Sequence, residues 1–274
     1  MKRIDLNYPE KNDVKYRIDR FPDGEVQLVF TEELNRKDEY EVLCRVTNAE
    51  ELFVLLQVGD ILDRQAVTWN LHIRYLMGMR MDRVMSFERP FTLRVVGKMI
   101  SQMGYGQCTI DSPHSEITMR EIRNATQLDM SPNRFLSLHM DHCIQLVYPD
   151  YGALCRYAEK PEKCVYFEKE RDLETGRIKS FNLMNKDMIW MADEFLFYDD
   201  LCDAGGTFLG ELKILKEYYP SANFYIMVTH IVNEIGFDNL CKNFDKVFAT
   251  ESYWNWGDVA KEKGYDNFIV IQQS

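Results

Sequence analysis

The order of apolar and polar positions along the chain predicts short strands that alternate with amphipathic helices. In the first half, residues 39–46 are expected to form a strand, residues 49–62 a helix with an apolar stripe, and residues 68–76 the next strand. A helix at 91–103 and a strand at 107–110 continue the series. This βαβ rhythm is typical of a parallel sheet flanked by helices.

The second half follows the same rhythm without repeating the sequence. Strands are expected at 144–148, 163–167, 194–198, 223–228, 246–249 and 267–271, with helices at 153–159 and 207–218. A polar segment around residues 130–143 separates the halves. The sequence therefore predicts an α/β protein of two domains, residues 1–140 and 141–274, each with a mainly parallel sheet.

Composition narrows the classes of function. The 33 basic and 44 acidic residues give a net charge of −11, which argues against nucleic acid or an anionic membrane as partner. The seven cysteines are scattered, form no CxxC pair and suggest reduced thiols. The first residues lack the apolar core of a signal peptide, and no uncharged stretch approaches the roughly 20 residues that span a bilayer. We expect a cytoplasmic protein that acts on small molecules.

The loops that follow strands are the most informative, because ligands of open parallel sheets bind beyond the carboxyl ends of the strands. Asp199 and Asp200 directly follow the strand predicted at 194–198, and adjacent carboxylates can accept hydrogen bonds from a vicinal diol. The turn that follows them consists of Asp203, Ala204, Gly205, Gly206 and Thr207. Such a turn presents backbone N–H groups and a helix N-terminus to a phosphate. The segment 199–207 therefore indicates a ribose 5-phosphate site, against the alternative of an ordinary strand–turn–helix.

Three other segments are ambiguous on their residues alone. Residues 21–25 (Phe-Pro-Asp-Gly-Glu) predict a turn that opens a strand. Residues 169–171 (Lys-Glu-Arg) suit a solvated charged loop. Residues 139–142 (His-Met-Asp-His) place two histidines on one helical face, but no third ligand is evident. We therefore interpret this last segment as surface or inter-domain chain rather than as a metal site.

Taken in order, these segments resemble the phosphoribosyl pyrophosphate (PRPP) synthetases, a family of ribose-phosphate diphosphokinases. Besides the turn at 21–25 and the loop at 199–207, the matching segments are 75–83, 110–115, 147–158, 167–171, 228–230 and 248–250. The resemblance implies two phosphoribosyltransferase-like domains, with 1–140 on the ATP side and 141–274 binding the ribose phosphate. It also implies transfer of the β,γ-diphosphate of MgATP to the anomeric hydroxyl of ribose 5-phosphate, which gives PRPP and AMP.

The resemblance assigns roles to individual residues. Lys169 and Arg171 would stabilise charge on the transferred phosphorus and on the leaving AMP, which suits a reaction that depends on positioning and electrostatics. The ATP-side residues would be Phe21, Asp23, Glu25, Arg80, Asp82 and His114. Asp150 and His114 would contact Mg²⁺ or the ATP phosphates, with Asp150 preferred because a hard cation favours oxygen. In the family the turn at 21–25 serves a neighbouring subunit, so a homo-oligomer, dimer or larger, is expected.

Several positions depart from the family pattern. The chain begins close to the turn at 21–25, so the family's opening strand and helix are expected to be mostly missing. Met81 replaces a glutamine, Ala153 a glycine and Ala204 a threonine. Without that threonine hydroxyl the phosphate loses a charge-assisted hydrogen bond of roughly 1.5–3 kcal/mol.

The change at Ala204 opens an alternative acceptor, ADP-ribose, whose terminal ribose has a substituted 5-phosphate and a free anomeric hydroxyl. Some synthetase-like proteins of bacterial viruses use it in NAD salvage. Two further alternatives are a phosphoribosyltransferase, which has a similar loop but uses PRPP as donor, and a catalytically inactive synthetase-associated regulatory subunit. The ATP-side motifs argue against the first of these, and Lys169 with Arg171 argue against both.

Overall fold

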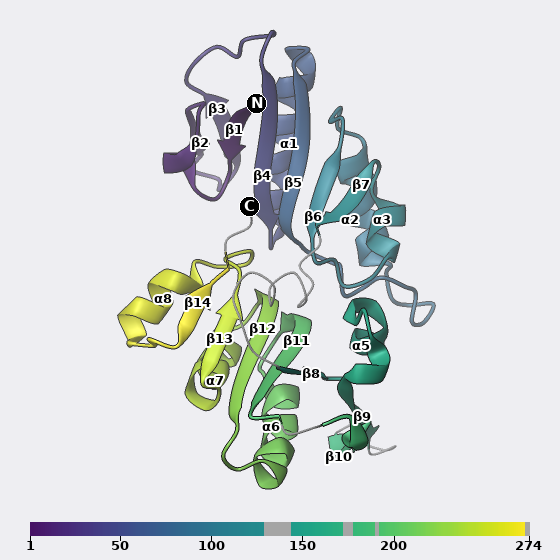
Figure 1. Ribbon diagram of the computed structural model, residues 1–274. Coiled ribbons are helices and arrows are strands. Elements are labelled where there is room, and N and C mark those ends of the chain that lie inside the picture. Colours follow the sequence, from purple (N-terminus) through teal and green to yellow (C-terminus); the bar gives the residue numbers. More distant parts are fainter. Residues whose placement is uncertain (129–143, 172–177, 190–191, 272–274) are drawn as a thin grey trace. The chain divides into compact units, whose positions relative to one another are not determined.

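The computed structural model describes residues 1–128, 144–171, 178–189 and 192–271, and it divides into two compact units (Figure 1). The units are Met1–Asp129 and Met130–Ser274. Each has its own buried apolar core, so each is described by itself. The segment 139–142, considered above as a metal site, lies outside the described residues.

The first unit is built on a five-stranded parallel sheet with the order β1-β4-β5-β6-β7. Its strands are β1 (Lys2–Asp5), β4 (Glu39–Val46), β5 (Thr68–Leu76), β6 (Cys108–Asp111) and β7 (Ala125–Leu128). The helices are α1 (Ala49–Arg64), α2 (Thr92–Ser101) and α3 (Ile117–Glu121). Strands β4 and β5 have the predicted bounds, because their apolar residues are buried on both faces of the sheet.

The expectation of a missing opening strand is wrong. Residues Lys2–Asp5 form β1, which pairs in parallel with β4 and buries Ile4 completely. Its four residues contain a single apolar side chain, so no pattern of apolar positions marks it. In place of an opening helix the chain has a single 3₁₀ turn, η1 (Pro9–Lys11).

A β-hairpin follows, formed by β2 (Tyr16–Arg20) and β3 (Val26–Phe30). Residues 21–25 make its turn, as predicted: the Phe21 N–H donates to the Glu25 carbonyl at 2.8 Å, and the Gly24 N–H to the Phe21 carbonyl at 2.9 Å. Gly24 has a φ of +92°, a left-handed conformation that favours glycine.

The second unit is built on a seven-stranded sheet with the order β10-β9-β8-β11-β12-β13-β14, parallel except for β10. The strands are β8 (Gln145–Tyr148), β9 (Val165–Arg171), β10 (Ile178–Met184), β11 (Glu194–Cys202), β12 (Asn223–Ile231), β13 (Lys246–Ala249) and β14 (Phe268–Val270). The α-helices are α5 (Tyr151–Tyr157), α6 (Gly206–Tyr218), α7 (Glu234–Asn243) and α8 (Trp256–Lys263), and η2 (Pro161–Lys163) and η3 (Lys186–Met188) are 3₁₀ turns. The predicted fold class, two mainly parallel sheets flanked by helices, is confirmed.

Alternate residues of the central strand β11 face two different cores. Phe195 and Phe197 pack in a cluster with the apolar residues of α6 and α7. Leu196 and Tyr198 pack in a second cluster with those of α5. This alternation fixes the face on which each later residue of the strand lies.

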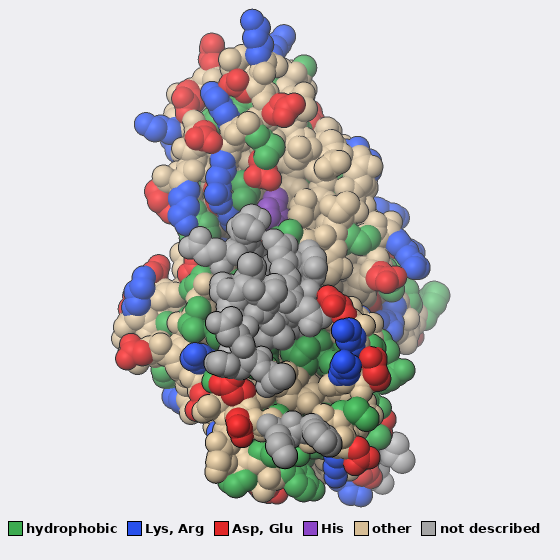
Figure 2. Space-filling view, in the orientation of Figure 1, with side chains coloured by type: hydrophobic (Ala, Val, Ile, Leu, Met, Phe, Trp, Pro, Cys, Tyr) green, Lys and Arg blue, Asp and Glu red, His purple; other side chains and the backbone are tan. Residues whose placement is uncertain are grey.

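The described helices include none that is long and apolar enough to cross a membrane. Figure 2 shows acidic and basic side chains interspersed over the described residues of the face in view, rather than a stripe of one sign.

Candidate functional site

The connections of the second sheet reverse direction between β8 and β11. From β8 the chain passes through α5 to β9 on one side, whereas from β11 it passes through α6 to β12 on the other. Ligands of open α/β sheets bind at such a switch point, beyond the carboxyl ends of the two strands. Asp150 follows β8 here, and the segment 199–207 covers the end of β11.

The two aspartates lie within β11, not in the loop after it. The strand continues to Cys202, four residues beyond the predicted end, because Leu201 and Cys202 stay paired with β12. Asp199 has the strand parity of Phe197, and Asp200 that of Tyr198. The two side chains therefore leave the strand on opposite faces of the sheet, and a hydrogen bond still joins their carboxyl groups.

Asp200 is directed to the α5 side and is only 1% exposed. Arg156 Nη2 of α5 lies 3.5 Å from its Oδ1, and the guanidinium of Arg156 lies over the Tyr157 ring at 5.4 Å. This pairing keeps the buried carboxylate compensated. Residues 147–158 were matched to the family as a segment, but the pattern alone gave Arg156 no role.

Asp199 is directed to the α6 side. Burial raises its pKa well above the usual value, and the charge of Asp200 adds to the rise. The Asp200 backbone N–H donates to Asp199 Oδ1 at 2.9 Å. A carboxyl that resists ionisation in this way gains when a ligand supplies hydrogen-bond donors to it.

The turn of residues 203–207 leads into α6 as predicted. Gly205 has a φ of +78° and forms the N-cap of α6, so the N-cap residue has no side chain to bond the first turn. Asp203 and Ala204 are exposed, and Thr207 is half-buried. The N-terminus of this 13-residue helix directs backbone N–H groups and the positive end of the helix dipole outward, which suits a phosphate.

Helix α7 supports this turn from behind. A Cβ on Gly236 would come 1.7 Å from the Asp203 carbonyl oxygen, so only glycine allows this approach. Asn239 Nδ2 donates to the Ala204 carbonyl at 2.9 Å, and Asn233 Nδ2 to Asp203 Oδ1 at 3.3 Å. These three residues of the chain were not among the predicted site residues, although Asn and Gly at spacings of three after a buried strand are a usable signal.

Lys169 lies in β9 on the other side of β8. Its Nζ is 3.3 Å from Asp150 Oδ2, and its side chain is 16% exposed. Asp150 Oδ1 accepts the Ala153 N–H at 2.9 Å and so caps α5. The second predicted catalytic residue, Arg171, ends β9, and its side chain lies outside the described part of the chain. Lys169 is thus in a strand rather than in a charged loop.

In the first unit, the loops after β5 and β6 bring predicted ATP-side residues together. Asp82 is 3% exposed and accepts two hydrogen bonds from Arg83, at 2.7 and 3.0 Å. These hydrogen bonds lower the pKa of Asp82, with further contributions from Ser115 and from the charge of His114. Arg80 is exposed in the same loop. Asp82 and His114 therefore share one environment.

The turn at 21–25 lies beside α1, on the β1 side of the sheet (Figure 1). Arg20 Nη2 pairs with Glu50 Oε1 of α1 at 2.6 Å. Phe21 and Glu25 line a groove of about 650 Å³ together with residues of α1, and Phe21 is 47% exposed. The turn thus belongs to a different region of the first unit from β6 and its following loop.

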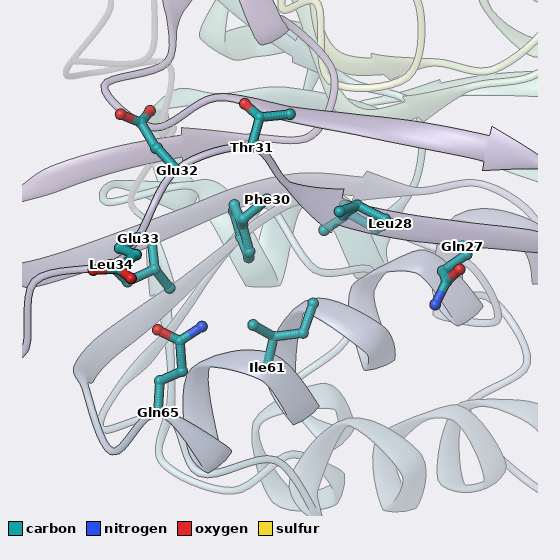
Figure 3. Close-up of a pocket in the computed structure, with 10 residues that line it drawn as sticks. Gln27, Leu28, Phe30, Thr31, Glu32, Glu33, Leu34, Ile61 and Gln65 are labelled. Carbon is teal, nitrogen blue, oxygen red and sulfur yellow. The ribbon is translucent and has the colours of Figure 1, made fainter.

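A neighbouring groove of about 690 Å³ lies between β3 and α1 (Figure 3). Its charged lining residues are Glu32 and Glu33, and no Lys, Arg or His lines it. A phosphate-bearing ligand needs positive potential, so this groove does not suit one.

No group of three or more His, Cys, Asp or Glu side chains within the described residues can hold a metal ion. Mg²⁺ that arrives with nucleotide phosphates needs only one or two protein carboxylates. Asp150 fits that lesser role, whereas His114 lies in the first unit.

Comparison with known proteins relates the chain to one group. No protein-family model matches it. A ribose-phosphate pyrophosphokinase of Thermoplasma acidophilum is 24% identical over 248 residues, covering 85% of this chain and 82% of the relative. One of Pyrococcus abyssi is 25% identical over 252 residues, covering 88% and 85%.

A comparison of folds relates the chain to the same group of proteins. The crystal structure of phosphoribosylpyrophosphate synthetase from Mycobacterium smegmatis matches with a TM-score of 0.74 at 16% identity, over 97% of this chain and 88% of that one. The resemblance inferred from the ordered motifs is confirmed: the chain is related in sequence to ribose-phosphate pyrophosphokinases and has the fold of a PRPP synthetase.

Proposed function

We propose that the protein transfers the β,γ-diphosphate of ATP to the anomeric hydroxyl of ribose 5-phosphate, forming PRPP and AMP. The observation that carries the proposal is the grouping at the β8–β11 switch point. There the N-terminus of α6, the carboxyl of Asp199 in β11 and the ammonium of Lys169 in β9 lie around the end of β8, the strand between β9 and β11. They provide a phosphate site, a hydroxyl acceptor and a cation for phosphoryl charge.

The ribose 5-phosphate would bind with its phosphate at the turn 203–207 and its hydroxyls toward Asp199. In the transfer, the anomeric hydroxyl gives up its proton to water and its oxygen forms a bond to the β-phosphorus. The bond from that phosphorus to the α,β-bridging oxygen breaks, and AMP keeps the bridging oxygen. Lys169, with Arg171, would stabilise the charge that develops on the phosphoryl oxygens. A Mg²⁺ ion bound to ATP would neutralise phosphate charge, and Asp150 offers it one carboxylate.

The ATP side of the reaction is proposed for the first unit. Asp82 and His114, which share one environment, and the exposed Arg80 are the candidates for nucleotide contacts. Phe21, Asp23 and Glu25 are proposed to act across a subunit contact. The half-exposed Phe21 and Phe53 beside the groove along α1 favour such a contact, and a homo-oligomer is therefore part of the proposal.

ADP-ribose is a second candidate acceptor, and Ala204 favours it. The exposed Ala204 offers the phosphate only backbone atoms, and its carbonyl is already bonded by Asn239. A methyl group in place of a hydroxyl leaves room for a phosphate that carries a further substituent. Both acceptors present the same anomeric hydroxyl, so the transfer itself would be unchanged.

The test is to incubate the protein with MgATP and either ribose 5-phosphate, ADP-ribose or no acceptor, and to follow AMP by chromatography. We expect AMP only when an acceptor is present. AMP with ADP-ribose alone would identify the second acceptor. No AMP with either acceptor would reject diphosphate transfer and favour a regulatory subunit.

The substitution Lys169→Ala tests the proposed role of Lys169 in the transfer. It should lower kcat by at least about 100-fold, as expected for loss of a group that stabilises the transition state, with little change in ATP binding measured by calorimetry. Lys179→Ala is the control, because Lys179 lies on the adjacent strand β10 and is exposed. A Lys169→Ala variant with wild-type kcat would refute the assignment of Lys169.

A further inference from the structure

Helix α6 carries a charged residue in its buried stripe. The buried positions of the helix are Phe208, Glu211, Leu212 and Leu215, which follow the spacing of one helix face. Glu211 is 0% exposed, and neither of its carboxyl oxygens has a hydrogen-bond partner among the described residues. An unpartnered polar group in such a place costs about 1–3 kcal/mol, so its presence calls for a role.

The strands beneath α6 show what Glu211 faces. Val165 and Phe167 of β9 pack in the same core cluster as α6, and Lys169 has their strand parity. Asp199 of β11 likewise continues the face of Phe195 and Phe197. Lys169 and Asp199 therefore lie on the face of the sheet that α6 covers, beyond its apolar residues.

Close packing holds α6 near β9 and β10. A Cβ on Gly210 would come 2.3 Å from Cε2 of Phe181, a residue of β10 that is paired with Lys169 of β9. Glycine at 210 thus allows the helix to approach the strand pair at the residue before Glu211. Such an approach brings the Glu211 carboxyl to the level of Lys169.

The charges around Glu211 agree with this placement. Burial raises the pKa of Glu211 well above its usual value, the charge of Lys169 opposes the rise, and Asp199 and Asp150 add to it. A carboxyl oxygen of Glu211 can accept an N–H hydrogen bond from Lys169.

The present partner of Lys169 holds it loosely. The distance of 3.3 Å from Nζ to Asp150 Oδ2 exceeds the roughly 2.7–2.9 Å of a strong charge-assisted bond. The Asp150 side chain is also 46% exposed, so a ligand can reach it. A ligand that engages Asp150 would leave Lys169 in need of a second acceptor.

We propose that Glu211 is a positioning residue for Lys169: when bound substrate engages Asp150, the buried carboxyl accepts a hydrogen bond from the ammonium group and holds it toward the reacting phosphate. The inference rests on the proposed diphosphate transfer. Glu211 itself touches no substrate and acts through Lys169.

The kinetic test compares Glu211→Leu with Glu211→Gln. Leucine cannot accept the hydrogen bond, so kcat should fall about 10- to 100-fold with KM for ribose 5-phosphate within about twofold, the pattern of lost positioning. Glutamine keeps the acceptor oxygen and should restore kcat to at least about tenfold above the leucine variant. Glu217→Leu, an exposed change on the same helix, is the control.

Thermal unfolding separates this role from a structural one. Glu211→Leu removes an unpartnered buried carboxyl, so its Tm should equal or exceed that of the wild type. A leucine variant with wild-type kcat, or a glutamine variant as impaired as the leucine variant, would overturn the proposal.

A labelling experiment tests the Lys169–Glu211 contact without any turnover. The rate at which an amine-reactive anhydride modifies Lys169 is measured by mass spectrometry in the wild type, Asp150→Asn, Glu211→Leu and the double variant. Asparagine keeps the cap of α5 but weakens the present ion pair. We expect Lys169 in each single variant to be modified at a rate within about twofold of the wild type, and in the double variant much faster. The effects of the two substitutions would then be non-additive.

Additive labelling rates would reject the contact between Lys169 and Glu211. Absence of AMP formation in the wild type with non-additive labelling would reject the proposed function and leave the contact standing. The two failures are thereby distinguishable.

Discussion

At the scale of single residues, one buried carboxylate of the first unit, unlike Glu211, has a cationic partner from another strand. The fully buried Asp5 at the end of β1 accepts two hydrogen bonds from Arg74 of β5, at 2.9 and 2.6 Å. Burial pushes the pKa of Asp5 upward, but the hydrogen bonds and charge of Arg74 outweigh it and the pKa is lowered. The pair ties the opening strand to the middle of the first sheet, and the sequence alone did not indicate it because 69 positions separate the partners.

Arg74→Met should lower the free energy of unfolding by about 3–5 kcal/mol near pH 7, because it leaves a buried carboxylate without its main partner. A carboxyl with a lowered pKa stabilises the fold above its unfolded pKa, about 3.9, and loses that contribution as the pH falls through its folded value. The difference between wild type and variant should therefore shrink toward about pH 4 and below. Urea denaturation across this range measures it.

The surface pair Arg17–Asp19 provides the control for that comparison. Its side chains are 59% and 41% exposed, so Arg17→Met should change stability by less than about 1 kcal/mol. Equal losses in the two variants, or a loss in Arg74→Met that is independent of pH, would contradict the account of the buried pair.

At the scale of elements, the strands that could be predicted from the sequence are those whose apolar residues are buried. Strands β4, β5 and β13 have the predicted bounds because apolar residues recur in each with at most one polar residue between them, and these apolar residues are buried. Strand β10 was missed: Lys179 and Asn182 interrupt its apolar residues, and its pairing with β9 is antiparallel at the edge of the sheet. Helix α7 was missed because Gly236 and Asn239 weaken the helical pattern.

Gly236 and Asn239 also support the proposed phosphate turn. The residues that weaken the helical pattern are therefore the ones that the site needs. Positions in the turn 203–207 could be predicted because Gly and Asp report a local backbone geometry. The groups that act on the turn from α7, and the face of the sheet to which each aspartate is directed, depend on pairing across distant strands. Local pattern carries no information about such pairing.

Gly236→Ala tests the support from α7. Its Cβ would lie 1.7 Å from the Asp203 carbonyl, so the turn must move away from the helix. Overpacking of this kind typically costs about 1–3 kcal/mol, and we expect weaker ribose 5-phosphate binding of about 10-fold or more by calorimetry. The adjacent exposed Ile235→Ala should leave binding unchanged. Unchanged affinity in Gly236→Ala would show that the turn does not depend on α7.

At the scale of the whole molecule, each unit buries its own apolar core. The residues proposed to bind ribose 5-phosphate all belong to the second unit. The energy of binding that ligand is therefore expected to stabilise the second unit specifically.

Hydrogen–deuterium exchange on the intact chain tests this expectation. At a ligand concentration of about 100 Kd, binding adds about 2.7 kcal/mol to the stability of the unit that holds the site. Amides that exchange through opening of that unit, such as those of Leu196 and Ile226 in β11 and β12, should slow by about 100-fold. Val42 and Ile73 in β4 and β5 should keep their rates. Ribose without the phosphate is the control ligand, and equal protection of both units would mean that the chain unfolds as one cooperative body.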